Sequence, residues 1–355
     1  MVASQSGTDL SADLQAGDDR GVFAWTHPDP FDASVSGKVP LERFQNDHAY
    51  SPITQVSATM NRPRAFTRTL LLTLLATLVI LPGCSAIQLA YGTAPFLIKR
   101  YVDSYLALDS DQLTQWEPRL TAMLDTHRVT ELPQLAGFFE AFYKASSEGF
   151  NANNARCLTS AFVDLYRRHA RLAVGAAAPL LAQLTPAQVR GLDANFAAQY
   201  AKARNRPELR DSARQVRKRT GRYIERIEEW TGPLRASQRA LVEEVSAPMP
   251  DTTVAVLEYR TQKRNELIRL LRARADEAAL RDFLTAWLVD YRDLTPALVS
   301  AEEQLGKTVE TLLIRLGASL DSAQRKYLNN RLISLRDAFM HLQNAPRLVP
   351  VSCRA

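Results

Sequence analysis

Residues 209–230 read LRDSARQVRKRTGRYIERIEEW, and the spacing of their larger side chains decides the fold class. Working outward from Val216, these side chains recur every three or four residues, which is the period of one face of an α-helix. The positions on that face are Leu209, Ala213, Val216, Thr220, Tyr223, Ile227 and Trp230. The segment therefore predicts an amphipathic helix with one face in the core.

The same spacing recurs through most of the chain, in stripes that begin at Leu113, Leu158, Leu298 and Leu328. No long segment alternates apolar and polar residues, and the hairpin dipeptides Asn-Gly and Asp-Gly do not occur. We therefore predict an all-α protein, an antiparallel multi-helix array of about ten helices after a signal peptide.

Residues 60–84 have the organisation of an export signal. Three arginines (Arg62, Arg64 and Arg68) precede the uncharged run Leu70–Leu81. As a helix this run would rise about 18 Å, which is too short for a hydrocarbon core of about 30 Å. It is therefore typical of a signal-peptide core and a poor permanent membrane span.

The run ends in Leu81-Pro82-Gly83-Cys84, which resembles the lipobox of bacterial lipoproteins. The resemblance implies that acyl chains join Cys84 and that the chain is cut just before it. Pro82 departs from the pattern, because Ala or Ser is usual there, and the alternative is an ordinary signal peptide with a chance cysteine. By the sorting rules of these lipoproteins, Ser85 after the cysteine implies an outer-membrane protein that faces the periplasm. Its partner would then be the membrane, which it contacts through the lipid anchor.

The chain divides into segments of different composition. Residues 1–59 carry eight acidic and three basic side chains, lack a long apolar run and are expected to be disordered. We expect Met60 to be the true start, the alternative being a genuine extension removed with the signal. The predicted segments are 1–59, the signal peptide 60–83, a lipidated tether 84–95, a helical domain 96–345 with a weak sub-boundary near 246–251, and a C-terminal tail 346–355.

One short pattern occurs four times: a leucine followed four residues later by a glutamine. The copies are Leu108–Gln112, Leu184–Gln188, Leu234–Gln238 and Leu320–Gln324, with an apolar residue four positions further on in each. Physically this is a helix start, because Asp109, Thr185 or Asp321 can cap free backbone N–H groups. The copies are unequally spaced, so they do not predict a regular solenoid.

Three histidines follow Cys84, and two of them, His127 and His169, lie on predicted apolar stripes. This placement raises the possibility that the two rings meet in the core. A metal site would need more convergent His, Asp or Glu ligands, so hydrogen-bonded structural histidines are the simpler interpretation. We predict no metal site, no cofactor and, in the absence of a nucleophile or phosphate-loop motif, no familiar enzyme class.

Cys157 and Cys353 are the two thiols that remain if Cys84 is lipidated. Because the bacterial envelope is oxidising, they are candidates for a disulfide that ties the end of the chain to a helix near Ala155. The alternative is two unpaired cysteines, one in the core and one in a frayed tail.

The segment 202–226 contains ten basic and three acidic residues. Its intact apolar stripe places these charges on exposed flanks, which is ordinarily a solvated helix face. The sharper hypothesis is contact with anionic lipid headgroups or an acidic partner. The candidate contact residues are Arg210, Arg214, Arg217 and Arg222.

Several short motifs resemble a family of uncharacterised proteobacterial lipoproteins, a domain of unknown function. They are Leu81–Ser85, Leu89–Tyr91, Tyr101–Tyr105, Leu108–Gln112 and His127–Pro133. In the last motif Arg128 and Glu131 are predicted to pair three residues apart on a helix, and Leu132-Pro133 to open the next helix. The motif is a functional site or a helix junction.

Leu184-Thr185-Pro186-Ala187-Gln188 also matches the Leu-Thr-x-x-Gln motif of small helical periplasmic chaperones. Two functional hypotheses follow. The first is a non-enzymatic, lipid-anchored helical protein that binds a partner in the cell envelope in a chaperone-like way, either a protein client or anionic headgroups; export excludes nucleic acid. The second is an envelope hydrolase with a site around His127, Glu131 and His169.

Overall fold

The computed structural model describes residues 83–206 and 211–352, and the described chain is an array of helices without strands. The all-α prediction is confirmed. The predictions for 1–59 and for the signal run 60–82, together with Arg210 and Cys353, lie outside the described residues.

The elements are α3 (Gly83–Leu106), α4 (Ser110–Thr126), the π-helix η2 (His127–Glu131), α5 (Leu132–Glu148), α6 (Ala152–Leu181), α7 (Pro186–Arg204), α8 (Ser212–Thr231), α9 (Ala236–Ser246), α10 (Thr253–Arg272), α11 (Glu277–Leu288), α12 (Pro296–Ser319) and α13 (Ser322–His341).

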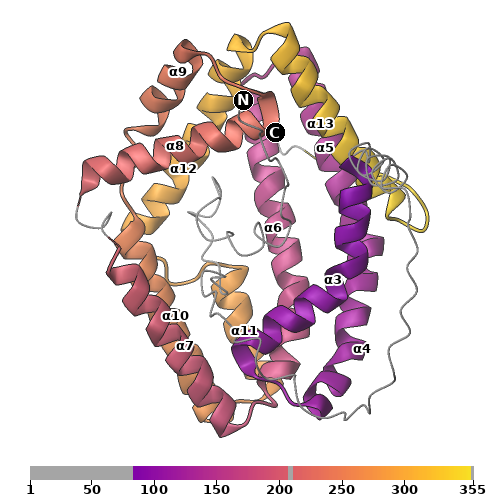
Figure 1. The fold of residues 1–355 in the computed structure, drawn as a ribbon, viewed down its shortest axis with the longest axis vertical. Coiled ribbons are helices and arrows are strands. Elements are labelled where there is room, and N and C mark those ends of the chain that lie inside the picture. The colour runs from indigo at the N-terminus through magenta and orange to yellow at the C-terminus, as the bar shows by residue number, and fades with distance from the viewer. Residues whose placement is uncertain (1–82, 207–210, 353–355) are drawn as a thin grey trace, which may run out of the picture.

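Helix α6 is the centre of the array and runs along the long axis of the molecule (Figure 1). It packs against α4, η2, α5, α11 and α12, while α7 lies along α10 and α5 along α13. The largest core cluster joins α4, α6, α7, α10 and α11 around the fully buried Trp287 and Leu280. A second cluster joins α8, α9 and α12 around Tyr223 and Val242. Apolar stripes thus meet across non-adjacent helices.

Helix α3 includes residues 84–95, the segment that was predicted to be a lipidated tether. Pro95 lies inside α3, where it removes one backbone hydrogen bond, and the indigo ribbon bends part-way along (Figure 1). Tyr91 anchors this half of α3 by donating a 3.2 Å hydrogen bond to the Leu124 carbonyl on α4. Among the described helices, none combines the length and apolarity needed to span a bilayer.

The four leucine–glutamine motifs start helices, as predicted, and their glutamines also bind one another in pairs. Gln112 donates to Gln188 Oε1 at 3.1 Å, and Gln188 donates to Gln112 Oε1 at 2.6 Å. Gln238 and Gln324 do the same at 2.9 and 3.1 Å. Each side-chain NH₂ group also reaches a carbonyl just before the partner's leucine: Gln183, Ala107, Ser319 and Pro233. The motifs therefore join α4 to α7 and α9 to α13.

The segment after α13 packs on the body of the protein. The Val349 N–H donates to the Pro133 carbonyl at 2.9 Å, and Val351 packs against the cluster that contains Leu158. Gly137 permits this approach, since a Cβ at that position would lie 1.7 Å from the Val349 carbonyl oxygen. The described part of the predicted tail is thus seated on α5 and α6.

Candidate functional site

The motif His127–Pro133 forms a π-helical turn between two α-helices. Helix α4 ends at Thr126, and the backbone N–H of Leu132 then donates to the His127 carbonyl five residues earlier. Leu132-Pro133 opens α5, as predicted, with Pro133 in the first turn. A π-turn widens the helix and changes which side chains share a face, and such turns are frequent at functional sites.

Three aromatic rings meet at this turn. His127 and His169 lie with ring centroids 5.1 Å apart, edge to face, so the two rings meet, but both residues are half-buried and lie outside the core. The Tyr91 hydroxyl lies 3.1 Å from His127 Nδ1, and the Arg128 guanidinium stacks over the Tyr91 ring. His169 Nδ1 lies 2.6 Å from the Leu165 carbonyl, which fixes its ring. The cluster joins α3, η2 and α6.

Glu131 pairs with Arg168 and not with Arg128, which corrects the predicted Arg128–Glu131 pair. Arg168 Nε and Nη2 donate to the two Glu131 carboxylate oxygens at 2.7 and 3.0 Å. The π-turn is the physical reason, because its wider spacing removes the ordinary helical relation between residues three apart. Thr130 Oγ1 adds a hydrogen bond of 2.9 Å to Glu131 Oε1. Glu131 is 4% exposed, so this carboxylate is a buried, fully engaged acceptor.

The surroundings set the charge of two of these groups. Burial, together with a smaller contribution from the nearby His169, lowers the pKa of His127 to about 4, and Glu131 opposes the shift. Burial alone would raise the pKa of Glu131, but hydrogen bonds from Arg168 and Thr130 outweigh it and lower that pKa. At neutral pH, His127 is therefore an uncharged ring and Glu131 a carboxylate.

The cluster has the composition of a hydrogen-bonded junction. Within residues 83–206 and 211–352, no group of three or more His, Cys, Asp or Glu residues is arranged to hold a metal ion. Sequence reasoning missed two members, Tyr91 and Arg168. Tyr91 was part of a motif that carried the family resemblance, and Arg168 directly precedes His169, but neither spacing could reveal the contact across helices.

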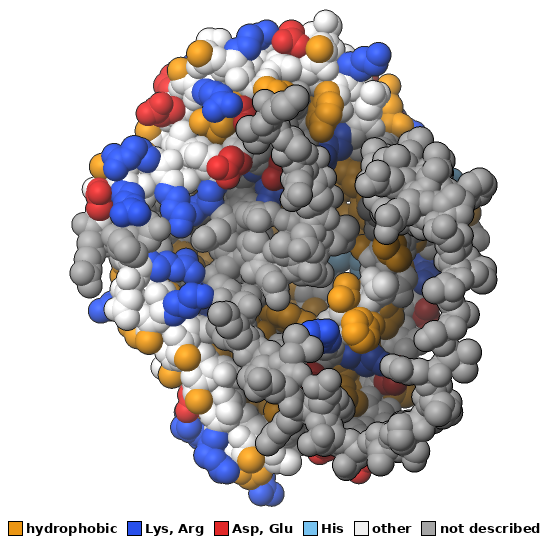
Figure 2. Space-filling model, viewed as in Figure 1, with side chains coloured by type: hydrophobic (Ala, Val, Ile, Leu, Met, Phe, Trp, Pro, Cys, Tyr) orange, Lys and Arg blue, Asp and Glu red, His pale blue; other side chains and the backbone are white. Residues whose placement is uncertain are grey.

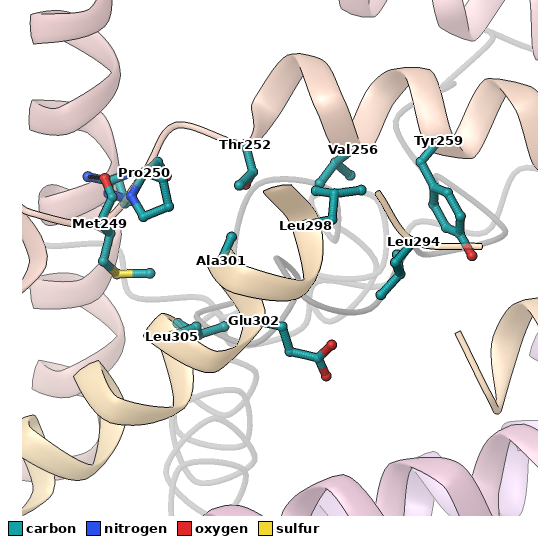
Figure 3. A pocket seen from close by; sticks show the side chains of 11 residues that line it. Met249, Pro250, Thr252, Val256, Tyr259, Leu294, Leu298, Ala301, Glu302 and Leu305 are labelled. Carbon is teal, nitrogen blue, oxygen red and sulfur yellow. Dashed lines mark hydrogen bonds between the residues drawn. The ribbon is translucent and has the colours of Figure 1, made fainter. Parts of the chain in front are cut away.

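Arg219 of α8 lies at a small cavity and is buried, although the charges of its segment were expected on exposed flanks. Arg219 is 3% exposed and donates to the carbonyls of Ser246, Met249 and Pro250 at 3.2, 2.9 and 3.2 Å. Figure 3 shows Met249 and Pro250 on one side of this cavity and Leu298, Ala301 and Leu305 of α12 beside them. Its volume of about 30 Å³ suits roughly one water. Arg219 thus fixes the 246–251 connection.

The other basic candidates differ in exposure. Arg214 and Arg217 are exposed on α8, while Arg222 is half-buried. Figure 2 shows lysine and arginine side chains gathered on the left of the view, over the region where α8 lies in Figure 1. The exposed basic surface is therefore centred on the first half of α8.

The cysteine candidates lie at three places. Cys84 is in the first turn of α3, and Cys157 is half-buried in α6, which begins at Ala152, close to the predicted Ala155. Since Cys353 is outside the described residues, the Cys157–Cys353 bridge stays a prediction. Val351 packs against the cluster that contains Leu158, the residue after Cys157.

In the described residues, fold and site together define an all-α array in which a π-turn gathers two histidines, a tyrosine and a Glu–Arg pair whose carboxylate is buried. The chain belongs to a family of unknown function, DUF6279, whose model matches residues 104–292, more than half of its length. The predicted membership of an uncharacterised family is thereby confirmed. No curated protein matches the sequence, and no solved structure matches it.

Proposed function

We propose that this chain is a lipid-anchored protein of the bacterial cell envelope whose helical body binds a partner there. Acyl chains on Cys84 would hold it to the periplasmic face of the outer membrane. The sequence supports this through the export signal and the lipobox-like residues Leu81–Cys84. The single observation that carries the proposal is the exposed apolar face of α3, the helix that begins at this position.

That face is built from two large side chains. Leu89 is 66% exposed and Phe96 is 60% exposed, and their spacing of seven residues places them on one side of α3, two turns apart. Arg100 follows four residues later and is also exposed. Apolar side chains beside a basic one are the composition of a helix that rests in a headgroup region. An anchor at Cys84 would bring this face to the bilayer.

The partner surface proposed here is the basic side of α8, around Arg214 and Arg217. Its charge complements an acidic partner protein in the envelope. Anionic headgroups would complement the same charges, and vesicle binding separates the two partners. The match to periplasmic chaperones rests on the leucine–glutamine motif alone. The glutamine pairs account for that motif as a structural element, so the motif does not carry a client-binding function.

A second candidate function is hydrolysis at His127, Glu131 and His169, which is favoured by their convergence at the π-turn. The engagement of Glu131 by Arg168 weighs against it, because a general base needs an oxygen that can reach the substrate. The low pKa of His127 also makes that ring a weak base. The binding function is therefore the one the geometry supports best.

Membrane anchoring is tested by a matched pair of cysteine variants. In cells, Cys84→Ala should move the protein out of the detergent-extractable membrane fraction, and mass spectrometry of the parent should find diacylglyceryl on residue 84. Cys157→Ala is the control and should stay in the membrane fraction. An unmodified residue 84 with the apolar run 70–81 still attached would overturn the proposal.

Partner binding is tested by crosslinking intact cells and capturing the lipidated protein. A dedicated binder should recover one principal protein, and Arg214→Glu with Arg217→Glu should lose it, while the exposed Lys144→Glu on α5 should not. Vesicles containing phosphatidylglycerol provide the other arm. If only the vesicles discriminate between parent and variant, the partner is the headgroup layer and the protein-binding proposal fails.

A further inference from the structure

An apolar cavity of about 300 Å³ lies between α6 and α11, with further walls from α3, α7 and α10. Helices α6 and α11 pack side by side in the middle of the array (Figure 1). Most of the lining residues are Ala, Val, Leu or Phe, and none of the described residues that line the cavity is Lys, Arg, Asp or Glu. The volume is at the lower end of the range for small-molecule sites, about 300–1,000 Å³.

The cavity is long and narrow, because it follows one face of α6. The lining positions on this helix begin at Tyr166 and recur at helical spacing as far as Leu181. At a rise of about 1.5 Å per residue, these two positions lie about 22 Å apart along the helix axis. A volume of about 300 Å³ spread over that length leaves room for a thin, extended occupant and not for a compact one.

One end of the cavity is closed. Leu106, Leu181 and Leu192, from the ends of α3 and α6 and the first half of α7, are all buried there. The first glutamine pair lies just beyond them. Gln112 donates to the carbonyl two residues after Leu181 at 3.0 Å, and Gln188 donates to the carbonyl directly after Leu106 at 2.9 Å. The glutamine pair therefore holds together the helix ends that close the cavity.

The cavity is open toward its other end. Tyr166, His169 and Ala170 are half-buried, and Ala173 is exposed. His169 also stacks on His127, so the open end lies beside the π-turn cluster. A molecule that enters from solvent would therefore pass this cluster and reach the buried leucines last.

The lining favours an apolar occupant over water. A buried water needs two to four polar partners, and the surface that the lining residues present is almost wholly apolar. An empty apolar cavity is destabilising, and its cost rises with its volume. In another protein, an engineered apolar cavity of about 150 Å³ stays dry and binds benzene. The cavity beside α6 is larger and equally apolar, so a hydrocarbon is the matching occupant.

We propose that this cavity binds a single unbranched hydrocarbon chain. The methyl end of the chain lies at Leu181, and the polar end stays outside, beside the π-turn cluster. Such a chain is carried by a free single-chain lipid or by a membrane phospholipid. The inference is independent of membrane anchoring, so it stands or falls separately from the proposed function.

The test uses the full chain with Cys84→Ser, which cannot be lipidated, and cis-parinaric acid, an unbranched fluorescent polyene whose emission rises in apolar surroundings. The probe should bind, and 1-decanol should displace it. 1-Adamantanol has the same number of carbon atoms in a compact cage and should displace the probe at least tenfold less well. Each methylene added between 1-octanol and 1-decanol should strengthen binding about fourfold, because each buries one further CH₂ group.

Two further competitors separate the sources of the chain. Displacement by hexadecanoic acid alone assigns a free single-chain lipid. Displacement by dioctanoyl phosphatidylglycerol as well assigns a chain of a membrane phospholipid. If neither displaces the probe, the proposal fails.

Two cavity-filling variants locate the site. Ala177→Phe on the wall formed by α6 should abolish probe binding, and Ala173→Phe does the same if circular dichroism shows that Ala177→Phe fails to fold. Ala187→Phe, exposed on α7 and outside the cavity, is the matched control and should retain binding. Equal displacement by the two ten-carbon alcohols, or undiminished binding by both filled variants, would overturn the proposal. Loss of binding in Leu89→Ser with Phe96→Ser, but not in the filled variants, would place the probe on the face of α3 and overturn it too.

Discussion

Gln112 and Gln188 exchange two side-chain hydrogen bonds across 76 residues of sequence, at the point where α4 and α7 begin. Each also accepts from the backbone N–H three residues before it, Asp109 and Thr185 respectively. One amide therefore caps its own helix and holds the start of another. Gln238 and Gln324 repeat the arrangement for α9 and α13.

This pairing predicts strong coupling between the two glutamines. Gln112→Ala or Gln188→Ala should each lower the free energy of unfolding by about 2 kcal/mol, because the change leaves buried polar groups unpaired. The double variant should cost clearly less than the two single losses added together. Urea unfolding measures all three, and Gln115→Ala, exposed on the same helix, is the control. Additive losses would show that the pair does not act as a unit.

Gly137 should be intolerant of any side chain. Gly137→Ala places a methyl group on the Val349 carbonyl and should destabilise the protein by about 1–3 kcal/mol while releasing the C-terminal segment. Gly175→Ala is the matched control: a Cβ there meets nothing within 4 Å, so the loss of helical glycine should stabilise by about 0.5–1 kcal/mol. Thermal melts and carboxypeptidase digestion measure the two effects, and equal behaviour of the variants would refute the contact.

The Glu131–Arg168 pair should contribute to stability more than an ordinary surface ion pair. Glu131→Gln removes the charge from a side chain that is 5% exposed and weakens its hydrogen bonds with Arg168. We expect a loss of about 2 kcal/mol in the free energy of unfolding, a figure that already allows for solvent screening at Arg168, which is 40% exposed. Glu117→Gln breaks the exposed Lys99–Glu117 pair and should cost under about 0.5 kcal/mol. Denaturant unfolding of both variants checks the contrast.

Acidification should weaken the fold through His127. Its pKa is lowered from 6.5 to about 4, so below pH 6.5 the unfolded chain binds a proton that the folded chain does not. Stability that is present above pH 6.5 is therefore lost as the pH falls toward 4. His127→Gln should flatten this part of the stability profile, whereas His341→Gln, on the exposed end of α13, should leave it unchanged. A parent profile that is flat over this range would contradict the assignment.

Oxidised protein should carry a bond between Cys157 and Cys353. Peptide mapping without reductant should recover the two segments as one linked species, and Cys157→Ala or Cys353→Ala should each lower stability by about 2–4 kcal/mol under oxidising conditions. Under reducing conditions, parent and variants should converge. Recovery of both cysteines as free thiols from freshly isolated envelopes would refute the bridge.

The sequence by itself determined the helical class, the helix starts and several core positions. It could do so because these depend on local spacing: Trp116 and Leu328 follow their motifs by four residues and are buried, and Asp109 caps the helix it precedes. The sequence did not predict the π-turn at His127–Glu131, because its residues also fit an ordinary α-helix.

Tertiary structure alone decided which of these local elements meet. The partner of Glu131 is Arg168 on another helix, the partner of Gln112 is Gln188, and the cavity beside Trp287 exists only where α6 and α11 face each other. Sequence periodicity fixes which side of a helix is apolar, but the pairing of helices depends on packing summed over the whole array. No single segment of the sequence determines that packing.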